Sequence, residues 1–376
     1  MLTIAATTLF FSHDLGRAIA IVVVATPTAL VVAGPAAMVC AMSRATRLRI
    51  LIKSTDFLER ATEVDTLILD KTGTVTIGAP TVTGIFPADG VDEGELLGVA
   101  ASCGFGSRHP VSRAVVGAAR RRGIEVTAPE EASERPGLGV LARINGEVAA
   151  LGRPALLAQE GLAVTATLTD PSTDVCVARG RRYLGRLTLC DIARAEARDA
   201  VQQMRELGLE RVVLLTGDRA AIAEEVGNAL GVDEIVADVL PEEKLAVVRR
   251  LQAEGRTVMM VGDGVNDALA LGGADVGVAI GAELNEVALG GADVALLGAD
   301  LGRLPRLLRL ADRTRRVIGQ NVWIAFWLAA LLIVLAAGGV VHPLAGAAAQ
   351  SLAVLAVVGN STRILREDDP QSAAAG

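Results

Sequence analysis

Three short aliphatic segments in the middle of the chain each lead into residues that can handle a phosphoryl group. Parallel strands present their carboxyl ends at one edge of a sheet, which is where α/β proteins place their sites. We therefore expect the three segments to be strands whose ends converge, with Lys244 adding a positive charge. Residues 64–69 precede Asp70-Lys71-Thr72-Gly73-Thr74, residues 211–215 precede Thr216-Gly217-Asp218, and residues 257–261 precede Gly262-Asp263-Gly264-Val265-Asn266-Asp267.

The residue types assign a role to each position. A carboxylate can accept a phosphoryl group as an acyl phosphate, so Asp70 is the expected nucleophile. Magnesium prefers oxygen ligands, and Mg²⁺ would be held by Asp263 and Asp267, with Asp70 and the backbone carbonyl of Thr72 completing the set. Thr216 and Lys244 would bind phosphoryl oxygens, one by its hydroxyl and one by its charge. The predicted catalytic residues are Asp70, Lys71, Thr72, Thr216, Gly217, Asp218 and Lys244.

Helical patterns fill the intervals between these strands. They cover residues 193–207, 220–230 and 242–254. Alternation of strands and helices is typical of a parallel sheet with helices on both faces. A single acid after a strand can also simply cap a helix, so the prediction depends on the whole set. The middle of the chain is thus predicted to be a doubly wound α/β head.

Uncharged segments near both ends predict membrane helices. Residues 18–43 contain no charged side chain, and this run of roughly 26 residues exceeds the ~20 that cross a bilayer as a helix. Residues 317–341 and 343–362 are two further uncharged runs, separated by a turn at His342-Pro343. Residues 1–12 are apolar but too short to span, so they predict a partial transmembrane helix.

The charge distribution predicts how these helices are oriented. Basic residues follow the segment 18–43, precede the segment 317–341 and follow the segment 343–362. The positive-inside rule places all three groups in the cytoplasm, which predicts a multi-pass protein of the cell membrane with a cytoplasmic catalytic head. The net charge of -7 gives no reason to expect nucleic acid as a partner. The four cysteines include no Cys-x-x-Cys pair, so no disulfide framework or zinc site is expected.

The ordered phosphate-handling motifs resemble the signature of the P-type ATPases, and the chain is most similar to their heavy-metal (type IB) branch from about Ala18 to Arg366. The resemblance implies a haloacid-dehalogenase-like phosphorylation domain with an inserted α+β nucleotide-binding domain. Ser107-Arg108-His109-Pro110 is similar to the Ser-Glu-His-Pro motif of the branch, and Gly137-Leu138-Gly139 to its Gly-x-Gly turn. The implied ATP-binding residues are His109, Pro110, Gly137 and Gly139. Taken alone, His109 would be interpreted as an ordinary structural histidine.

The same resemblance divides the head into domains. The phosphorylation domain is expected at residues 60–80 and 185–300, and the nucleotide-binding domain at residues 81–184. Gly78-Ala79-Pro80 and Asp170-Pro171 have the composition of turns and are the expected crossings. Membrane helices at 1–12, 18–43, 317–341 and 343–362 flank this head.

The membrane segment departs from the branch at its metal-binding motif. Thr26-Pro27-Thr28 stands where the branch has Cys-Pro-Cys, and these residues are the expected transport path. Hydroxyls and carbonyls freed at a proline break suit harder ions than thiolates do. The other polar candidates can equally serve only to pack helices together, and they are Cys40, Asn321, Gln350, Ser351 and Asn360.

Three further departures concern catalysis. Arg108 replaces a glutamate and Leu269 replaces a proline of the family pattern. No segment resembles the actuator domain, whose Thr-Gly-Glu loop directs water onto the aspartyl phosphate in the family. We therefore expect an N-terminally truncated chain, or a separate chain that supplies the actuator. Thr72 stands where related phosphatases carry an acid and base, so the acyl phosphate should be long-lived.

Three functions follow as alternatives. The first is ATP-driven transport of a metal cation, with ATP and Mg²⁺ as cofactors and the lipid bilayer as surroundings. The second is a degenerate regulatory or assembly subunit that binds nucleotide without transport, which the residues at 26, 28, 108 and 269 favour. The third is a membrane-tethered phosphatase, which Thr72 and the proline-containing membrane helix argue against.

Overall fold

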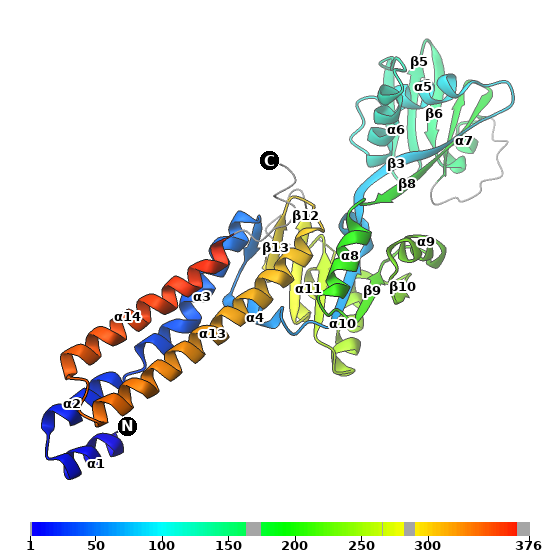
Figure 1. The fold of residues 1–376 in the computed structure, drawn as a ribbon. Helices are drawn as coiled ribbons and strands as arrows, with labels where there is room; N and C mark the ends of the chain where they lie inside the picture. Colours follow the sequence, from blue (N-terminus) through cyan, green and yellow to red (C-terminus); the bar gives the residue numbers. More distant parts are fainter. Residues whose placement is uncertain (1, 163–173, 265, 282–289, 367–376) are drawn as a thin grey trace. The chain divides into compact units, whose positions relative to one another are not determined.

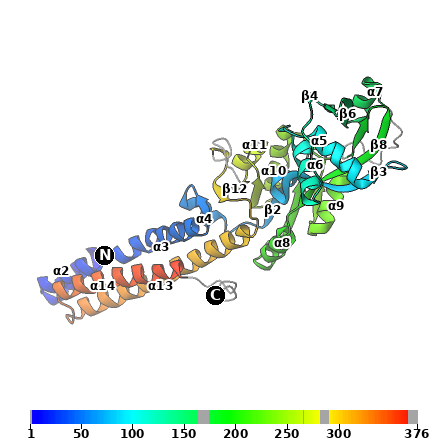
Figure 2. The same ribbon diagram turned by 90° about the horizontal axis from the view of Figure 1, so that it is seen from above.

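The protein consists of two compact units. The computed structural model describes residues 2–162, 174–264, 266–281 and 290–366. Unit 1 comprises Met1–Thr74 and Ala195–Gly376, and unit 2 comprises Val75–Arg194. Unit 1 carries the membrane helices and a parallel sheet, and unit 2 is built on an antiparallel sheet (Figures 1 and 2).

The sheet of unit 1 has the predicted strands at its centre. Its order is β1-β13-β12-β11-β2-β9-β10, and only β1 runs antiparallel to its neighbour. The strand β2 lies between β11 and β9, so the three predicted strands are direct neighbours. The strand bounds are β1 Ile50–Ile52, β2 Thr66–Asp70, β9 Arg211–Leu215, β10 Glu234–Val236, β11 Val258–Gly262, β12 Val276–Gly281 and β13 Val294–Leu297.

Helices cover this sheet because its central strands are apolar on both faces. Every residue of β2 and of β11 is buried. Ile68 packs with Val248 and Leu251 of α10, whereas its neighbours Leu67 and Leu69 point to the opposite face and are equally buried. This confirms the doubly wound arrangement. The helix bounds are α4 Thr55–Arg60, α8 Ala197–Glu206, α9 Ala220–Leu230, α10 Lys244–Ala253 and α11 Ala268–Gly273.

The membrane helices form a bundle at one end of unit 1 (Figure 1). Three candidate spans are long and apolar enough to cross a bilayer, Leu15–Arg47, Arg303–Ala337 and Pro343–Leu365, and Leu2–Ser12 is a shorter apolar helix. The predicted segment 18–43 is not one helix, because α2 (Leu15–Val24) and α3 (Thr28–Arg47) are separate. The break falls at Thr26-Pro27, since proline lacks the N–H that would continue the helix. The remaining helices are α1 Leu2–Ser12, α13 Arg303–Ala337 and α14 Pro343–Ser361.

The helix predicted over 317–341 differs at both ends. It begins at Arg303 and ends at Ala337, and Gly339 adopts a positive φ of 74° in the following turn. Its first turns bury Leu304, Leu307 and Leu310. The sequence rule counts only uncharged residues, so it missed the amphipathic part of the helix that lies in the head.

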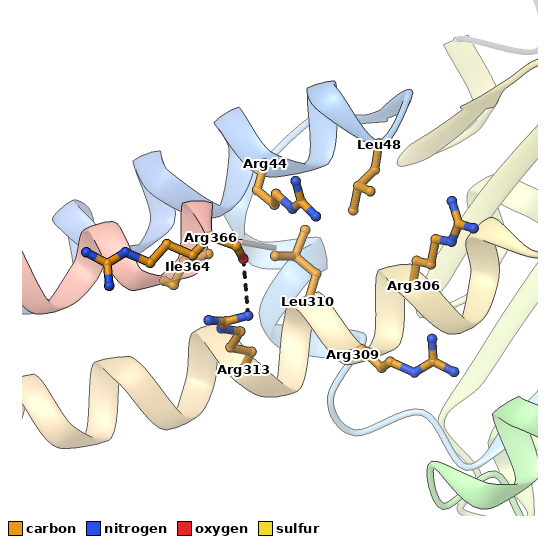
Figure 3. Close-up of a pocket in the computed structure, with 8 residues that line it drawn as sticks. All are labelled: Arg44, Leu48, Arg306, Arg309, Leu310, Arg313, Ile364 and Arg366. Carbon is orange, nitrogen blue, oxygen red and sulfur yellow. Dashed lines mark hydrogen bonds between the residues drawn. The ribbon is translucent and has the colours of Figure 1, made fainter. Parts of the chain in front are cut away.

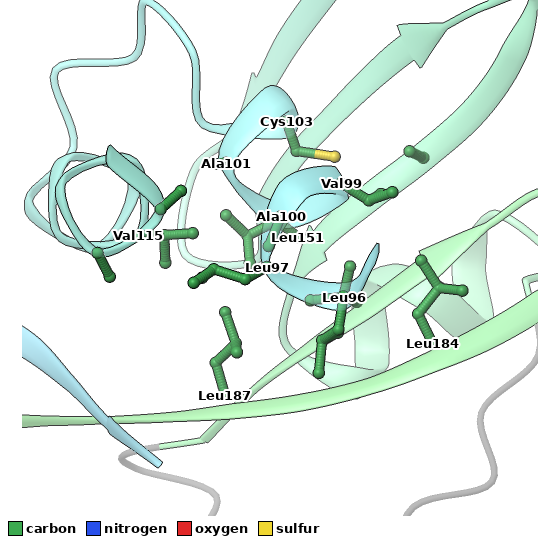
Figure 4. Packing of buried hydrophobic residues seen from close by; sticks show 14 of the residues in the cluster. Leu96, Leu97, Val99, Ala100, Ala101, Cys103, Val115, Leu151, Leu184 and Leu187 are labelled. Atoms are coloured by element: carbon green, nitrogen blue, oxygen red, sulfur yellow. The ribbon is translucent and has the colours of Figure 1, made fainter. Parts of the chain in front are cut away.

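Unit 2 is a six-stranded antiparallel sheet with its own core. Its order is β3-β8-β7-β6-β5-β4. Leu96 and Leu97 of α5 pack with Val115 of α6 and with Leu184 and Leu187 of β8 (Figure 4). The bounds are β3 Thr76–Pro87, α5 Glu93–Cys103, α6 Pro110–Arg121, β4 Glu131–Arg135, β5 Gly139–Ile144, β6 Glu147–Gly152, α7 Pro154–Gln159, β7 Asp174–Arg179 and β8 Arg182–Ala193.

The chain passes between unit 1 and unit 2 at positions that differ from the expected domain boundaries. The boundaries of unit 2 are Val75 and Arg194, whereas the sequence placed them at 81 and 184. The reason is that β3 and β8 pair along most of their lengths, from Thr76 opposite Ala193 onward. Gly78-Ala79-Pro80 is not a crossing but an irregularity in this pairing, with Gly78 at φ 73°. The other expected crossing, Asp170-Pro171, lies outside the described residues.

Candidate active site

Asp70 lies at the carboxyl end of β2 and shares one cation with Asp267. Residues two apart on a strand face the same way, so Asp70 lies on the same side as Ile68, toward α10. Lys244, the first residue of α10, places its Nζ 2.5 Å from Asp70 Oδ1 and 2.6 Å from Asp267 Oδ1. The three side chains are buried, with exposed fractions of 4%, 6% and 1% for Asp70, Lys244 and Asp267. Two buried carboxylates therefore face a single ammonium group.

This arrangement shifts the pKa of the nucleophile candidate upward. Burial raises the pKa of Asp70 to about 7, and the Asp267 carboxylate adds to the rise against the opposing effect of Lys244. Burial also raises the pKa of Asp267, again opposed by Lys244. Burial lowers the pKa of Lys244, but the two carboxylates outweigh it and the net shift is upward. Strongly shifted groups at strand ends are a physical mark of functional sites.

The residues after Asp70 form a tight turn. Thr72 (φ -77°, ψ 123°) and Gly73 (φ 75°, ψ -13°) have the angles of a type II turn, in which glycine takes the left-handed position without strain. Thr72 is exposed, and Lys71 is buried in an ion pair with Asp218. The turn thereby directs the backbone of residues 71–74 back over the end of the sheet.

Thr216 lies beside Asp70 because their strands are in register. Leu215 of β9 is paired with Asp70, and Thr216 follows it directly. The Thr216 hydroxyl is buried and accepts a hydrogen bond from the Asp218 N–H at 3.1 Å. At Gly217 a Cβ would lie 3.1 Å from the carbonyl oxygen of Val239, so the chain passes close to its neighbour there. Six of the predicted catalytic residues thus lie at the carboxyl ends of the adjacent strands β2 and β9, and the seventh, Lys244, begins α10 beside them.

The acidic residues after β11 fit the expected magnesium site only in part. Among the described residues, no group of three or more His, Cys, Asp or Glu is close enough to hold a metal ion. However, Oδ2 of Asp267 is buried and has no hydrogen-bond partner among them. Gly262 leaves room for this oxygen, since a Cβ there would lie 2.3 Å from it. Burial and the Asp267 carboxylate raise the pKa of Asp70 most, and the carboxylate of Asp263 is near enough to add to this rise. An unpartnered carboxylate oxygen among acids is compatible with a hard cation.

In unit 2, the predicted nucleotide residues line one cavity of about 230 Å³. His109, Gly137 and Gly139 all border it, whereas Pro110 is the first residue of α6 behind it. Four charged residues that the sequence did not indicate also border it, namely Glu134, Arg135, Arg153 and Asp174. Glu134 and Arg135 lie on β4, Arg153 precedes α7 and Asp174 begins β7, so no local spacing connects the three positions. The described residues of this unit therefore include a pocket near the size of small-ligand sites.

The ring of His109 has a structural role that also orients it. Its Nδ1 accepts a hydrogen bond of 3.3 Å from the Val111 N–H and so caps α6, with Pro110 at the first helical position. A neutral ring whose Nδ1 accepts carries its proton on Nε2. Ser107 supports the turn, because its Oγ accepts from the His109 N–H at 3.1 Å and donates to Glu134 at 2.5 Å. His109 therefore caps α6 and borders the cavity at the same time.

The two glycines of Gly137-Leu138-Gly139 are required for different structural reasons. Gly137 has a φ of 74°, with no heavy atom within 4 Å of an added Cβ, so it meets only a conformational requirement. A Cβ on Gly139 would lie 2.3 Å from the carbonyl oxygen of Leu151. A Cβ on Gly152, its partner in the register, would lie 2.3 Å from the carbonyl oxygen of Leu138. The close approach of β5 and β6 at the cavity wall thus requires both Gly139 and Gly152.

In the membrane bundle, Gln350 of α14 fills the break between α2 and α3. Its Nε2 donates to the carbonyl oxygens of Val24 and Thr26, at 2.6 Å each. The Thr28 hydroxyl donates to its Oε1 at 3.3 Å. Thr26, Pro27, Thr28 and Gln350 line one small cavity of about 20 Å³. The residues of the predicted transport path therefore present neutral polar groups to a cavity whose other lining residues are apolar.

The other polar membrane residues connect helices. Asn321 of α13 donates to Ser361 at 2.9 Å and to the Ala33 carbonyl at 3.3 Å, and it accepts from Asn360 at 2.9 Å. The hydroxyl of Ser351 bonds only within its own helix, to the Ala347 carbonyl. These contacts agree with the helix-packing alternative for Asn321 and Asn360.

Comparison with known proteins assigns the family. The profile of the haloacid dehalogenase-like hydrolases matches residues 64–275. The chain is 38% identical over 373 residues to a manganese-exporting P-type ATPase of Mycobacterium leprae, covering 96% of this chain and 51% of that protein. It is 38% identical over 372 residues to a zinc-exporting P-type ATPase of Mycobacterium marinum, covering 96% and 51%. The chain thus spans about half the length of the curated relatives it matches.

The fold agrees with the sequence comparison. A crystal structure of a zinc-transporting PIB-type ATPase in the E2.Pi state matches with a TM-score of 0.80 and 32% identity, over 97% of this chain and 62% of that one. The catalytic domain of the CPx-ATPase CopB-B matches with a TM-score of 0.58 and 28% identity, over 71% of this chain and 98% of that one. The chain belongs to the haloacid dehalogenase-like hydrolases, and over nearly its whole length it is similar to metal-exporting P-type ATPases.

Proposed function

We propose that the chain transfers the γ-phosphoryl group of ATP to Asp70 and that this reaction drives transport of a metal cation through the membrane bundle. The observation that supports it most is the pair of buried acids, Asp70 and Asp267, that share Lys244 at the carboxyl end of the central strands. A buried nucleophile with a fixed counter-charge is suited to attack on a polyanion. The similarity to metal-exporting relatives extends the proposal from the site to the membrane helices.

The transfer step uses the carboxylate of Asp70 as nucleophile. An Asp70 oxygen forms a bond to the γ-phosphorus while the bond from that phosphorus to the β–γ bridging oxygen breaks, and its electron pair leaves with ADP. Lys244 lowers the repulsion between the carboxylate and the phosphate, and the Thr216 hydroxyl can donate to a phosphoryl oxygen. Gly217 lets the backbone approach, and the ion pair of Lys71 with Asp218 holds the turn and strand end together.

Magnesium would be held by Asp263 and Asp267, with Asp70 and the Thr72 carbonyl. Bound there, the ion would neutralise charge on the phosphate oxygens. The unpartnered Oδ2 of Asp267 supports this assignment. In the absence of the ion, the ammonium of Lys244 supplies the positive charge between the two carboxylates.

The cavity of unit 2 is the proposed site for the nucleoside part of ATP. The Nε2–H of His109 is left to face a ligand, because its Nδ1 is used in the helix cap. Gly137 and Gly139 give the cavity a wall without side chains, and Pro110 fixes the start of α6. Glu134 and Arg153 add one negative and one positive hydrogen-bonding group to the cavity. Arg108 is exposed and does not take their place.

The cation would pass at the break between α2 and α3. Thr26 and Thr28 supply hydroxyls, Pro27 frees backbone carbonyls, and Gln350 already bonds two of them. Neutral oxygen ligands favour a harder ion over a soft one. The basic clusters at the ends of the helices support a cytoplasmic head. The exporting relatives support export as the direction.

Release of the phosphate from Asp70 requires a general base, which the motif from Asp70 to Thr74 does not contain. Thr72, two positions after Asp70, cannot act as a general base at neutral pH. We propose in addition that another segment or a separate chain directs water onto the aspartyl phosphate. The transfer reaction at Asp70 does not depend on this partner.

The test measures whether phosphorylation depends on the transported ion. The chain is purified in detergent and incubated with γ-labelled ATP, Mg²⁺ and, in turn, Mn²⁺, Zn²⁺, Cu⁺ or Ag⁺, and acid-stable label is counted. We expect at least one of the four cations to increase the label, and Thr28→Val to raise the concentration required about tenfold through loss of a ligand. Thr46→Val is the matched control, since Thr46 lies at the other end of α3 and bonds only Met42 of its own helix. Label that is indifferent to all four cations contradicts the coupling.

A further inference from the structure

Five arginines line one small cavity where the membrane helices enter the head. They come from three elements, since Arg44 lies on α3, Arg306, Arg309 and Arg313 lie on α13, and Arg366 follows α14 (Figure 3). The remaining lining residues are apolar, Leu48, Leu310 and Ile364. No carboxylate is among the lining residues that the structure describes, so this part of the chain concentrates positive charge at the cavity.

The positions on α13 are costly for arginine. Residues 306, 309 and 313 follow the helical repeat and lie on one face of the helix. Arg306 lies in the first turn, where the positive end of the helix dipole disfavours a cation. Its guanidinium makes no hydrogen bond or ion pair with any residue that the structure describes. By contrast, Arg303 pairs with Asp300 at 3.3 Å and Arg316 with Asp312 at 2.8 Å. An external anion would offset the charge of Arg306.

Contacts within the protein hold the cavity together. Nη2 of Arg313 donates to the Arg363 carbonyl at 2.7 Å, and its Nη1 donates to the Arg366 carbonyl at 3.4 Å. An arginine on the last carbonyls of a helical segment stabilises its end. This contact fixes the chain after α14 against α13 and places Arg366 at the cavity. The guanidinium of Arg366 itself makes no hydrogen bond or ion pair with the described residues.

The cavity reaches the depth of lipid headgroups. The uncharged part of α13 begins at Val317, so Arg313 is about 6 Å and Arg306 about 16 Å beyond it at 1.5 Å per residue. Arg44 is the first charged residue after the uncharged segment 18–43. The headgroup layer extends roughly 5–8 Å beyond each side of the hydrocarbon core. Arg44 and Arg313 therefore lie at phosphate depth, with Arg306 on the water side.

The size of the cavity selects the ligand. Its volume is about 90 Å³. Pockets for drug-sized molecules start at about 300 Å³, so a nucleotide or a folded peptide does not fit. A single phosphodiester does fit, and the apolar floor of Leu48, Leu310 and Ile364 suits the carbon atoms next to it. Basic pockets between transmembrane helices on the cytoplasmic side bind anionic headgroups.

We propose that this cavity binds the phosphodiester headgroup of an anionic phospholipid in the cytoplasmic leaflet. Arg44 and Arg313 lie nearest the phosphate, Arg306 faces the outer end of the headgroup, and Arg309, which also donates to Gln203 at 2.5 Å, and Arg366 complete the lining. The acyl chains lie along the apolar surface of α14 and α3. The site depends on the helices spanning the membrane and is independent of phosphoryl transfer at Asp70.

The experiment counts lipids bound to the full chain by native mass spectrometry. Phosphatidylglycerol and phosphatidylcholine with identical acyl chains are added together in neutral detergent. We expect one phosphatidylglycerol to be retained under conditions that remove phosphatidylcholine. The paired change Arg306→Gln with Arg366→Gln should lower its retention at least tenfold, because two of the five guanidinium groups that line the cavity are lost. Neither guanidinium makes a hydrogen bond or ion pair with the described residues, so folding should be preserved.

A second pair of changes separates this site from general surface attraction. Arg315→Gln with Arg316→Gln removes the same charge from the same helix, closer to the membrane but outside the cavity. Retention should stay at the wild-type level. An equal loss in this pair would overturn the proposal.

Competition on the wild-type chain distinguishes a lipid site from a site for free anions and needs no variant. Inorganic phosphate at millimolar concentration should not displace phosphatidylglycerol, since it has no acyl chains. Displacement by phosphate, or equal retention of the two lipids, would show that the cavity does not select an anionic lipid.

Discussion

At the scale of single residues, Lys244 sets the electrostatics of the candidate site. Its ammonium lies within 2.6 Å of both Asp70 and Asp267, and all three groups are buried. Two carboxylates around one ammonium leave an uncompensated negative charge at neutral pH. Burial of that charge favours protonation of Asp70 and destabilises the ionised folded state. Stability is thus sacrificed for reactivity, as is common at active sites.

This arrangement predicts an inverted pH dependence for a carboxylate. Burial raises the pKa of folded Asp70 from its ordinary value of 3.8 to about 7, so its contribution to stability is greatest below the unfolded pKa and is lost as pH rises through 7. Asp70→Asn should therefore raise the melting temperature at pH 8 in the presence of a chelator. The gain should disappear near pH 4. Thermal unfolding of both proteins across this range is the measurement, and a variant less stable than wild type at pH 8 would contradict the electrostatic account.

The glycines of the unit 2 cavity give a second prediction. Gly139→Ala should destabilise the protein by about 2 kcal/mol or more, since the added methyl would overlap the Leu151 carbonyl. Gly137→Asn is the matched control, because asparagine tolerates a positive φ and the space around Gly137 is open. Chemical denaturation compares the two variants. Equal losses of stability would mean that conformation, and not close approach, is what both positions require.

The site residues differ in how far local sequence could predict them. Asp70, Thr216 and Asp263 follow aliphatic strands directly, so spacing alone placed them at the sheet edge. Glu134 and Asp174 of unit 2 come from strands that are not neighbours in its sheet, and only the folded unit brings them to one cavity. That Lys244 bridges two acids could not be predicted, because the orientation of α10 relative to β2 is a tertiary property.

At the scale of elements, the broken membrane helix depends on α14. Breaking a helix at Pro27 leaves carbonyl groups without partners in an apolar environment. Gln350 donates to two carbonyls at the break, those of Val24 and Thr26, and the Thr26 carbonyl also accepts from the Thr28 N–H at 2.9 Å. The helix break and Gln350 therefore form one structural unit, to which α2, α3 and α14 contribute.

Replacement of this glutamine provides the third prediction. Gln350→Leu should lower stability in detergent by about 1–2 kcal/mol, since the Val24 carbonyl loses its donor and the Thr26 carbonyl keeps only the Thr28 N–H. Ser351→Ala should change it little, because the Ser351 hydroxyl bonds only its own helix. Thermal unfolding of the two variants is the comparison. A Gln350→Leu protein as stable as Ser351→Ala would show that the carbonyls find other partners.

Elements were predicted best where one signal is strong. The bounds of β9 and α9 agree with the sequence, since each is a periodic run with turn residues at its ends. The start of α13 was wrong because its first part is amphipathic and charged on one side. Leu269, in place of a family proline, lies exposed in the first turn of α11, where proline and other residues are both tolerated.

At the scale of the whole molecule, unit 2 is inserted into unit 1 at a single pair of strands. The chain enters through β3 and leaves through β8, and these strands pair with each other. Unit 2 has two buried clusters of its own, one beneath α5 and α6 and one beneath α7. The sequence predicted the insertion but placed its ends inside the paired strands, since pairing between distant segments leaves no local mark.

The paired ends predict that unit 2 folds alone. A fragment of residues 75–194 should show the dispersed amide spectrum of a folded protein and bind ATP, with His109→Ala weakening the binding through loss of the ring. Two-dimensional NMR and calorimetry would measure both properties. A folded fragment with no affinity for ATP would place the nucleotide elsewhere, and an unfolded one would show that the core needs unit 1.

The central claim is that Asp70 receives the phosphoryl group, and phosphoenzyme formation tests it most directly. The chain is incubated with γ-labelled ATP, Mg²⁺ and the screened metal cations, quenched in acid and treated with hydroxylamine, which cleaves acyl phosphates. We predict hydroxylamine-labile label in the wild type and in Asp65→Asn, a matched change just before β2, and none in Asp70→Asn. If ATP binds but no condition gives a label, or if Asp70→Asn is labelled as the wild type is, the chain is not an aspartyl-phosphate enzyme and a nucleotide-binding subunit becomes the better account.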